Sequence, residues 1–125
     1  MISVALVVMM MVSPPADSSS RALSPEVQRV VVSWYGPGLQ GNPMANGERF
    51  DRHCVETVAH KTLPFGTRVW FRNPINGYQL IAKVKDRGPY SPGRDFDLSE
   101  AAAERLDFKA QGEATLEVLV MEAGP

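Results

Sequence analysis

Several short stretches of the chain alternate between hydrophobic and polar residues with a period of two, the pattern of a strand that buries one face. The clearest alternation places Leu80, Ala82 and Val84 between more polar neighbours in residues 78–85. Another strand is expected to end at Asp97. The remaining stretches with strand character are residues 27–35, 57–60, 67–72 and 114–121. About six short strands are therefore predicted.

One short helix is predicted at residues 98–106. Leu98 and Leu106 lie on the same face at helical spacing, with alanines between them. Asp97 and Glu100 precede and begin this run at the three-residue spacing of a capping box. The pattern thus indicates that the carboxylate of Asp97 starts the helix.

Six strands and one helix in roughly a hundred residues are too few for a two-layer α/β sheet. They suffice for a small closed barrel, which leaves no exposed sheet edge. Ten glycines and ten prolines fit the tight turns that such a barrel needs. The predicted fold is mainly β, a small closed barrel with one short helix, although periodicity alone does not say which barrel.

Composition narrows the classes of function. The chain has 125 residues, 44% of them hydrophobic, as expected for one compact domain. Its net charge of -1 provides no general attraction to nucleic acid, so no nucleic-acid partner is expected. Cys54 is the only cysteine and excludes an internal disulfide. It adjoins His53, but without a second spaced pair these two residues do not describe a metal site.

The N-terminal region predicts export. Residues 2–12 form an apolar run that is too short for the ~20 residues of a membrane-spanning helix and fits the core of a signal peptide. No Lys or Arg precedes the run, so a disordered or packed apolar terminus is the alternative. Cleavage is expected between Ala16 and Ala22, and Cys54 lies too far away to carry a lipid anchor. The expected parts are a signal peptide at 1–16, a Ser- and Pro-rich linker at 17–25 and a folded domain at 26–122.

Asp86 and Asp97 stand eleven residues apart, each where a strand is expected to end. The Arg87-Gly88-Pro89 turn follows Asp86 and should point its carboxylate in a fixed direction. Both residues have structural alternatives. For Asp97 the alternative is a cap at the helix start, and for Asp86 it is a clamp on the turn at Arg87 or an ion pair with Arg94.

Five ordered blocks in residues 30 to 121 together resemble the rare lipoprotein A (RlpA) family of bacterial cell-wall proteins. The blocks are Ser33-Trp34-Tyr35-Gly36, residues 45–51 (Ala-Asn-Gly-Glu-Arg-Phe-Asp), residues 59–67 (Ala-His-Lys-Thr-Leu-Pro-Phe-Gly-Thr), Asp86-Arg87-Gly88-Pro89 and Asp97-Leu98-Ser99. The resemblance implies a six-stranded double-psi β-barrel, like those of expansins and barwin-like endoglucanases. It also implies a lytic transglycosylase that cuts MurNAc-GlcNAc bonds of peptidoglycan and leaves 1,6-anhydro sugars.

The resemblance assigns candidate catalytic roles to Glu48, His60, Asp86 and Asp97, with the two aspartates favoured and His60 able to orient one of them. A single carboxyl group can protonate the leaving oxygen and then take the proton of the attacking C6 hydroxyl, so no metal or organic cofactor is expected. Such an acid needs a raised pKa near neutral pH. Glu48 has no preferred role, and a core histidine is the alternative for His60.

The same resemblance suggests residues that bind substrate. Trp34 and Tyr35 could stack on sugar rings, although aromatic residues late in a strand also pack in cores. Arg49, Arg87 and Arg94 could contact the lactyl carboxylate of muramic acid, or remain solvated.

The chain departs from the family pattern in three places. Met44 replaces the usual Thr, Lys85 replaces the usual Asn, and one extra residue separates Glu48 from His60. An ammonium group that reached Asp86 from Lys85 would lower the pKa of that carboxyl.

The predicted function is an exported lytic transglycosylase in the periplasm or cell envelope, with peptidoglycan glycan strands as its partner. The alternative is an expansin-like module that binds or loosens wall glycan without turnover.

Overall fold

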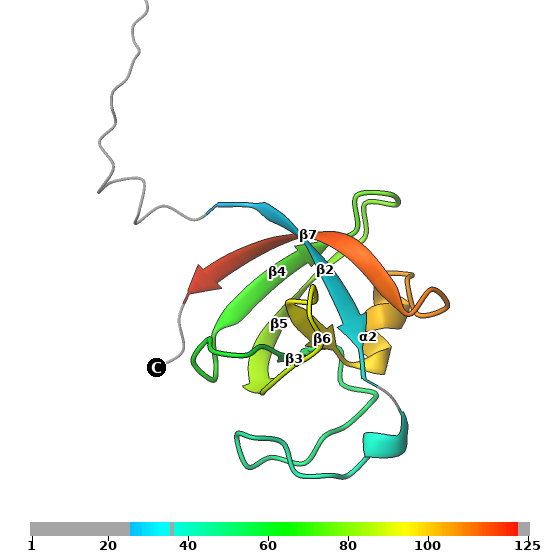
Figure 1. The fold of residues 1–125 in the computed structure, drawn as a ribbon. Coiled ribbons are helices and arrows are strands. Elements are labelled where there is room, and N and C mark those ends of the chain that lie inside the picture. The colour runs from blue at the N-terminus through cyan, green and yellow to red at the C-terminus, as the bar shows by residue number, and fades with distance from the viewer. Residues whose placement is uncertain (1–25, 36, 123–125) are drawn as a thin grey trace, which may run out of the picture.

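The computed structural model describes residues 26–35 and 37–122, and Figure 1 shows them as a closed β-barrel. The signal peptide and linker expected at 1–25 lie outside the described residues. The strands are β2 (Gln28–Trp34), β3 (Thr57–Ala59), β4 (Arg68–Arg72), β5 (Gln79–Asp86), β6 (Phe96–Leu98) and β7 (Glu113–Glu122). A short 3-10 helix, η2 (Pro37–Leu39), follows β2, and one helix, α2 (Glu100–Arg105), connects β6 to β7.

The six strands close in the order β2-β6-β3-β5-β4-β7, with β7 pairing back to β2. The β2–β6 and β3–β5 pairs are parallel, and the other four pairs are antiparallel. Neighbours in the barrel are therefore mostly distant in sequence. This mixed barrel with one short helix confirms the predicted mainly β fold.

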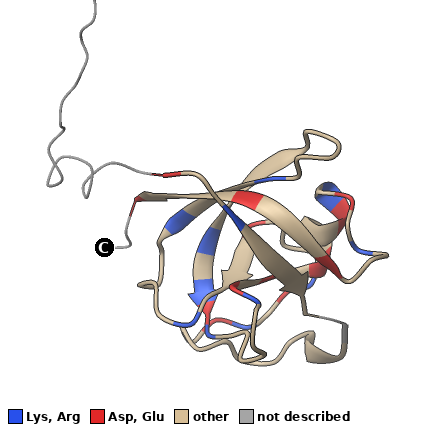
Figure 2. Cartoon of the chain, turned by 45° about the horizontal axis from the view of Figure 1, so that its top comes forward, with Lys and Arg blue, Asp and Glu red and all other residues tan. Residues whose placement is uncertain are grey.

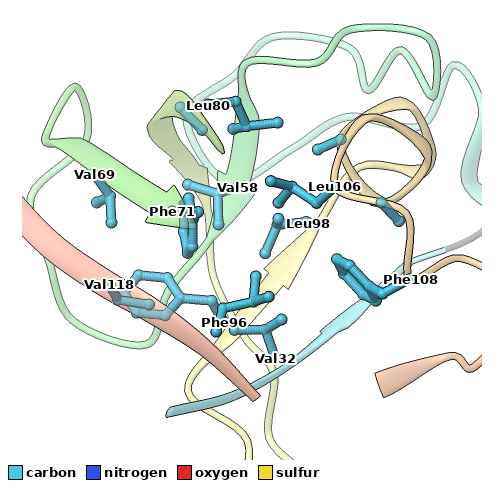
Figure 3. Close-up of a cluster of buried hydrophobic side chains, with 14 of the residues drawn as sticks. Val32, Val58, Val69, Phe71, Leu80, Phe96, Leu98, Leu106, Phe108 and Val118 are labelled. Atoms are coloured by element: carbon cyan, nitrogen blue, oxygen red, sulfur yellow. The ribbon is translucent and has the colours of Figure 1, made fainter. Parts of the chain in front are cut away.

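The barrel interior is filled by the residues that the alternation predicted. Leu80, Ala82 and Val84 of β5 are all buried, as expected. Figure 3 shows the interior side chains converging from several strands and from the α2 region. Phe71 and Phe96 meet edge to face with ring centroids 5.2 Å apart, a favourable aromatic geometry. The packed interior makes the barrel a rigid support for residues on its outer face.

The predicted start of the helix is wrong. Ser99 is the N-cap residue, and its Oγ accepts a hydrogen bond from the Ala102 backbone N–H at 3.1 Å. Asp97 belongs to β6, and Leu98 pairs with strands on both sides, so the helix cannot begin before Ser99. Asp97 is therefore not a helix cap, and that structural alternative is excluded.

A long connection at residues 37–56 crosses the end of the barrel beside β5. Two backbone N–H groups hold it there: Ala45 donates to Asp86 Oδ1 at 2.9 Å, and Asn46 donates to the Lys85 carbonyl at 3.2 Å. Phe50 is buried and stacks on Tyr35 with ring centroids 4.5 Å apart. These contacts fix the connection over the strand ends (Figure 1).

Glu100 joins this connection to the helix. Its buried carboxylate lies 2.9 Å from Arg52 Nε and 2.7 Å from Lys109 Nζ. The hydrogen bond from Lys109 lowers the pKa of Glu100. Figure 2 shows that basic and acidic residues are interspersed over the barrel. Ion pairs such as those of Glu100 fit this distribution.

Replacing Ser99 by Ala should lower the free energy of unfolding by about 1–2 kcal/mol, because the cap and a second hydrogen bond are both lost. The second bond runs from Ser99 Oγ to the Cys54 carbonyl at 2.6 Å. Urea denaturation measures the change. Ser91→Ala is the matched control, since Ser91 is only partly buried in a bend. Equal effects of the two substitutions would contradict the capping role.

Candidate active site

The strand register brings the two predicted aspartates into one row. Asp86 of β5 pairs with Ala59 of β3, Ala59 pairs with Asp97 of β6, and Asp97 pairs with Ser33 of β2. Two strand spacings separate the aspartates, so their Cα atoms lie about 10 Å apart. The small side chain of Ala59 stands between them. The row therefore places the two carboxylates on the same outer face of the barrel, with Ala59 between them.

A register shift in β5 turns the side chain of Asp86 to the outer face of the barrel. Val58 pairs with Val84, but the next residue, Ala59, pairs with Asp86, so Lys85 is an extra residue in β5. A bulge of this kind turns the following side chain to the other face of the strand. Asp86 consequently shares the outer face with Ala59 instead of following Val84 into the core.

Asp97 is held in a partly buried position. Its neighbours Phe96 and Leu98 point into the core, so its own side chain points out of the barrel. The buried Ser33 hydroxyl donates to Asp97 Oδ1 at 2.5 Å. Burial raises the pKa of Asp97, and the charge of Asp86 adds to the rise, whereas Ser33 and Arg94 oppose it. Asp97 thus keeps its proton to higher pH than an ordinary aspartate.

Asp86 is fixed by main-chain donors. Its Oδ1 accepts hydrogen bonds from the Ala45 and Arg87 N–H groups, each at 2.9 Å. Its Oδ2 has no hydrogen-bond partner within residues 26–35 and 37–122. Asp86 does clamp the turn at Arg87, as its structural alternative predicted. The alternative pairing with Arg94 is wrong, because Arg94 Nε lies 3.5 Å from Glu113 Oε2.

Tyr35 adds a protonated phenol to the row. Burial raises its pKa strongly, and the charges of Asp86 and Asp97 raise it further, so the hydroxyl stays protonated. Phe50 holds one face of the ring, and the hydroxyl donates a hydrogen bond to Met44 Sδ at 4.0 Å. Tyr35 is therefore a neutral phenol near both carboxylates.

His60 follows β3 and lies next to this row. Its Nδ1 accepts hydrogen bonds from the Thr62 and Leu63 N–H groups at 3.1 and 3.0 Å, so the neutral ring carries its proton on Nε2. The ring packs on Phe96 with centroids 4.7 Å apart. Burial lowers the pKa of His60, and Arg87 contributes to the fall although Asp95 opposes it. His60 is thus a neutral N–H donor at pH 7.

Glu48 and Arg49 lie in the exposed turn of the long connection. Lys85 Nζ is 3.5 Å from Glu48 Oε1, so Lys85 forms its ion pair with Glu48. Arg49 donates to the Gly41 carbonyl at 2.9 Å and stabilises the loop. Within the described residues neither side chain bonds to Asp86 or Asp97, and Glu48 borders the site through Lys85.

Two other predicted binding residues are engaged in the fold. Trp34 packs against the core, and its Nε1 donates to the Lys109 carbonyl at 3.1 Å. Arg87 donates to the His60 and Leu63 carbonyls at 3.2 and 2.8 Å. Arg94 instead lies close enough to Asp97 to lower its pKa. The structure therefore brings Asp86, Asp97, Tyr35 and Arg94 together.

Ser33 was missed by sequence reasoning. It was part of a recognised block, but nothing local distinguishes its hydroxyl from that of an ordinary strand serine. The only signal was its position two residues before Tyr35, on the same strand face. Its partner Asp97 is 64 residues away.

No three His, Cys, Asp or Glu side chains gather into a metal-binding group in the part of the chain that the structure describes. Over the same residues, no helix has the length and apolar character needed to cross a membrane.

The sequence pattern of the lytic transglycolase family matches residues 27–118, which includes every residue of the carboxylate row. The chain belongs to this family of double-psi barrels. The resemblance to RlpA proteins is thereby confirmed.

Two curated relatives of this lytic transglycolase domain support the assignment to the family. It is 48% identical over 82 residues to the "Probable endolytic peptidoglycan transglycosylase RlpA" of Synechocystis sp., covering 66% of this chain and 25% of that protein. It is 40% identical over 94 residues to the "Endolytic peptidoglycan transglycosylase RlpA" of Campylobacter jejuni, covering 75% and 34%. The chain thus spans a quarter to a third of the length of these two relatives.

A solved structure supports the fold of the lytic transglycolase domain. The expansin of Clavibacter michiganensis superimposes with a TM-score of 0.60 at 21% identity, covering 80% of this chain and 54% of that one. This likeness concerns the barrel architecture alone.

Two substitutions in the lytic transglycolase domain should shift the pKa of Asp97 in opposite directions. Asp86→Asn removes a negative charge and should lower this pKa, whereas Arg94→Gln removes a positive charge and should raise it. The carboxyl ¹³C shift of Asp97, followed against pH by NMR, measures both. Asp107→Asn, on the exposed turn after α2, is the control and should leave the pKa unchanged. Shifts of the same sign would disprove the arrangement.

Proposed function

We propose that this domain is a lytic transglycosylase that cleaves peptidoglycan glycan strands in the cell envelope, with Asp97 as the acid. The observation that carries the proposal is the partly buried Asp97 carboxyl, which has a raised pKa and lies on the outer face beside Asp86. A general acid must be protonated at working pH, and burial shifts the pKa of Asp97 in the direction that this role requires. The family match and the names of the relatives support the same chemistry.

The reaction needs one proton donor and no water. Asp97 donates its proton to the glycosidic oxygen as the bond from C1 of muramic acid breaks. The resulting carboxylate then accepts the proton of the C6 hydroxyl, and the C6 oxygen bonds to C1. The products are a 1,6-anhydro end and a free hydroxyl on the leaving sugar. Asp97 ends the cycle protonated, so activity should fall as pH rises through its raised pKa.

The neighbouring groups have complementary roles. The negative charge of Asp86 stabilises the positive charge that develops on the sugar ring in the transition state. The Tyr35 hydroxyl, which stays protonated near both carboxylates, is a donor that can position a sugar hydroxyl group. His60 packs on Phe96 and supports the segment after β3 through its Nδ1 acceptor. Ser33 holds Asp97 Oδ1, which leaves Oδ2 to exchange the proton.

Pure protein incubated with denuded glycan strands should release fragments with 1,6-anhydro ends, which mass spectrometry detects 18 Da below the hydrolysis products, the mass of one water. Reducing ends would indicate a hydrolase instead. Sedimentation with sacculi but no release would support the non-catalytic, expansin-like alternative and overturn the proposal.

Asp97→Asn should lower the rate by a factor of about 10²–10⁴, because it removes the acid. Asp86→Asn should lower it by a similar factor while glycan binding is retained. Product release measured by chromatography tests both, with Asp107→Asn as the matched control on an exposed turn. Full activity of either variant would remove that aspartate from the mechanism.

A further inference from the structure

A pocket of about 350 Å³ opens at the start of β7, away from the two aspartates. It lies between β2, the loop that joins β4 to β5, and the turn that precedes β7. Its size is at the lower end of the ~300–1,000 Å³ range of small-molecule sites. The residues that matter for its chemistry are Pro74, Ile75, Gln111, Glu113 and Thr115.

The lining suits a sugar ring. Ile75, which is 92% exposed, and the half-buried Pro74 provide apolar surface at the rim, whereas Phe108 is buried in the core behind the pocket. Gln111 and Thr115 are exposed, and their side chains have no hydrogen-bond partner among the residues that the structure describes. Small-molecule sites typically combine apolar walls with a few polar side chains that have no other partner. In such a site the walls contact the apolar face of a sugar ring, and the polar side chains bind its hydroxyl groups.

The strand register links one wall of the pocket to the carboxylate row. Glu113, on its wall, pairs with Ser33 of β2, which in turn pairs with Asp97. The pocket edge therefore lies two strand spacings, about 10 Å, from Asp97. That separation is close to the length of one disaccharide repeat of a glycan strand. Arg94 lies between the pocket and Asp97, because its Nε is 3.5 Å from Glu113 Oε2 and its charge acts on Asp97.

We propose that this pocket is a distal subsite, which holds a sugar of the disaccharide repeat next to the one cleaved at Asp97. The inference rests on the proposed function and extends it to the length of strand that the domain recognises. A strand that lies across β6, β2 and β7 passes Arg94 and enters the pocket. Its sugar packs on Pro74 and Ile75 and bonds to Gln111 and Thr115. A tetrasaccharide cut at its central bond ends before the pocket, whereas an octasaccharide reaches it.

The test compares denuded tetrasaccharide and octasaccharide as substrates. In the unmodified protein kcat/KM should be higher for the octasaccharide. Thr115→Trp fills the pocket and should lower the octasaccharide-to-tetrasaccharide ratio of kcat/KM about tenfold, the loss expected for one modest binding contact. Ile81→Trp, also on a partly exposed outward strand position but on β5, is the matched control and should keep the ratio. An unchanged ratio in Thr115→Trp would overturn the proposal.

Binding gives a readout that does not depend on turnover. Calorimetry with octasaccharide and the Asp97→Asn variant, with and without Thr115→Trp, should show weaker binding when the pocket is filled. If the unmodified protein releases no anhydro product but filling the pocket still weakens binding, the proposed reaction fails and the subsite stands. If product forms and binding is equal in both variants, the subsite alone is refuted.

Discussion

The pairing of β5, β3, β6 and β2 is the constraint on which the site depends. The row from Asp86 through Ala59 and Asp97 to Ser33 exists only because these strands are held in one register. A slip by one residue would turn every side chain of a strand to the opposite face. The extra residue Lys85 makes the required correction in β5. Since the barrel is closed, no strand can slip without disturbing its neighbours.

Two similar carboxylates acquire different properties from their surroundings. Burial raises the pKa of Asp97, although the hydroxyl donor from Ser33 opposes the rise. Asp86 receives two backbone N–H donors, one of them from the connection that crosses the barrel end, and these donors fix the direction of its carboxylate. The proposed roles of acid for Asp97 and charge stabiliser for Asp86 rest on this difference in surroundings. Tyr35 lies beside both and remains a neutral donor.

Most of the basic side chains near the site are occupied in holding it together. Arg87 binds two carbonyls of the segment after β3, and Lys85 is paired with Glu48. Arg94 is different, because it lies between Asp97 and Glu113 and connects the carboxylate row to the pocket at β7. Recognition of the glycan strand would therefore depend more on hydrogen-bond donors and apolar surface than on a general positive charge.

The sequence alone determined the strands long enough to show a period, such as β5 with its buried Leu80, Ala82 and Val84, and the motifs that identify the family. It predicted a strand that ends at Asp97 but not the bounds or partners of β6, because three residues are too few for a period, and the local Asp97-x-x-Glu100 pattern also resembled a helix cap. Only the tertiary structure decided that Asp97 lies in a strand opposite Ser33, 64 residues away, and that a bulge points Asp86 outward. Local patterns record the propensity of each segment, whereas register, burial and the resulting pKa values arise when distant segments pair.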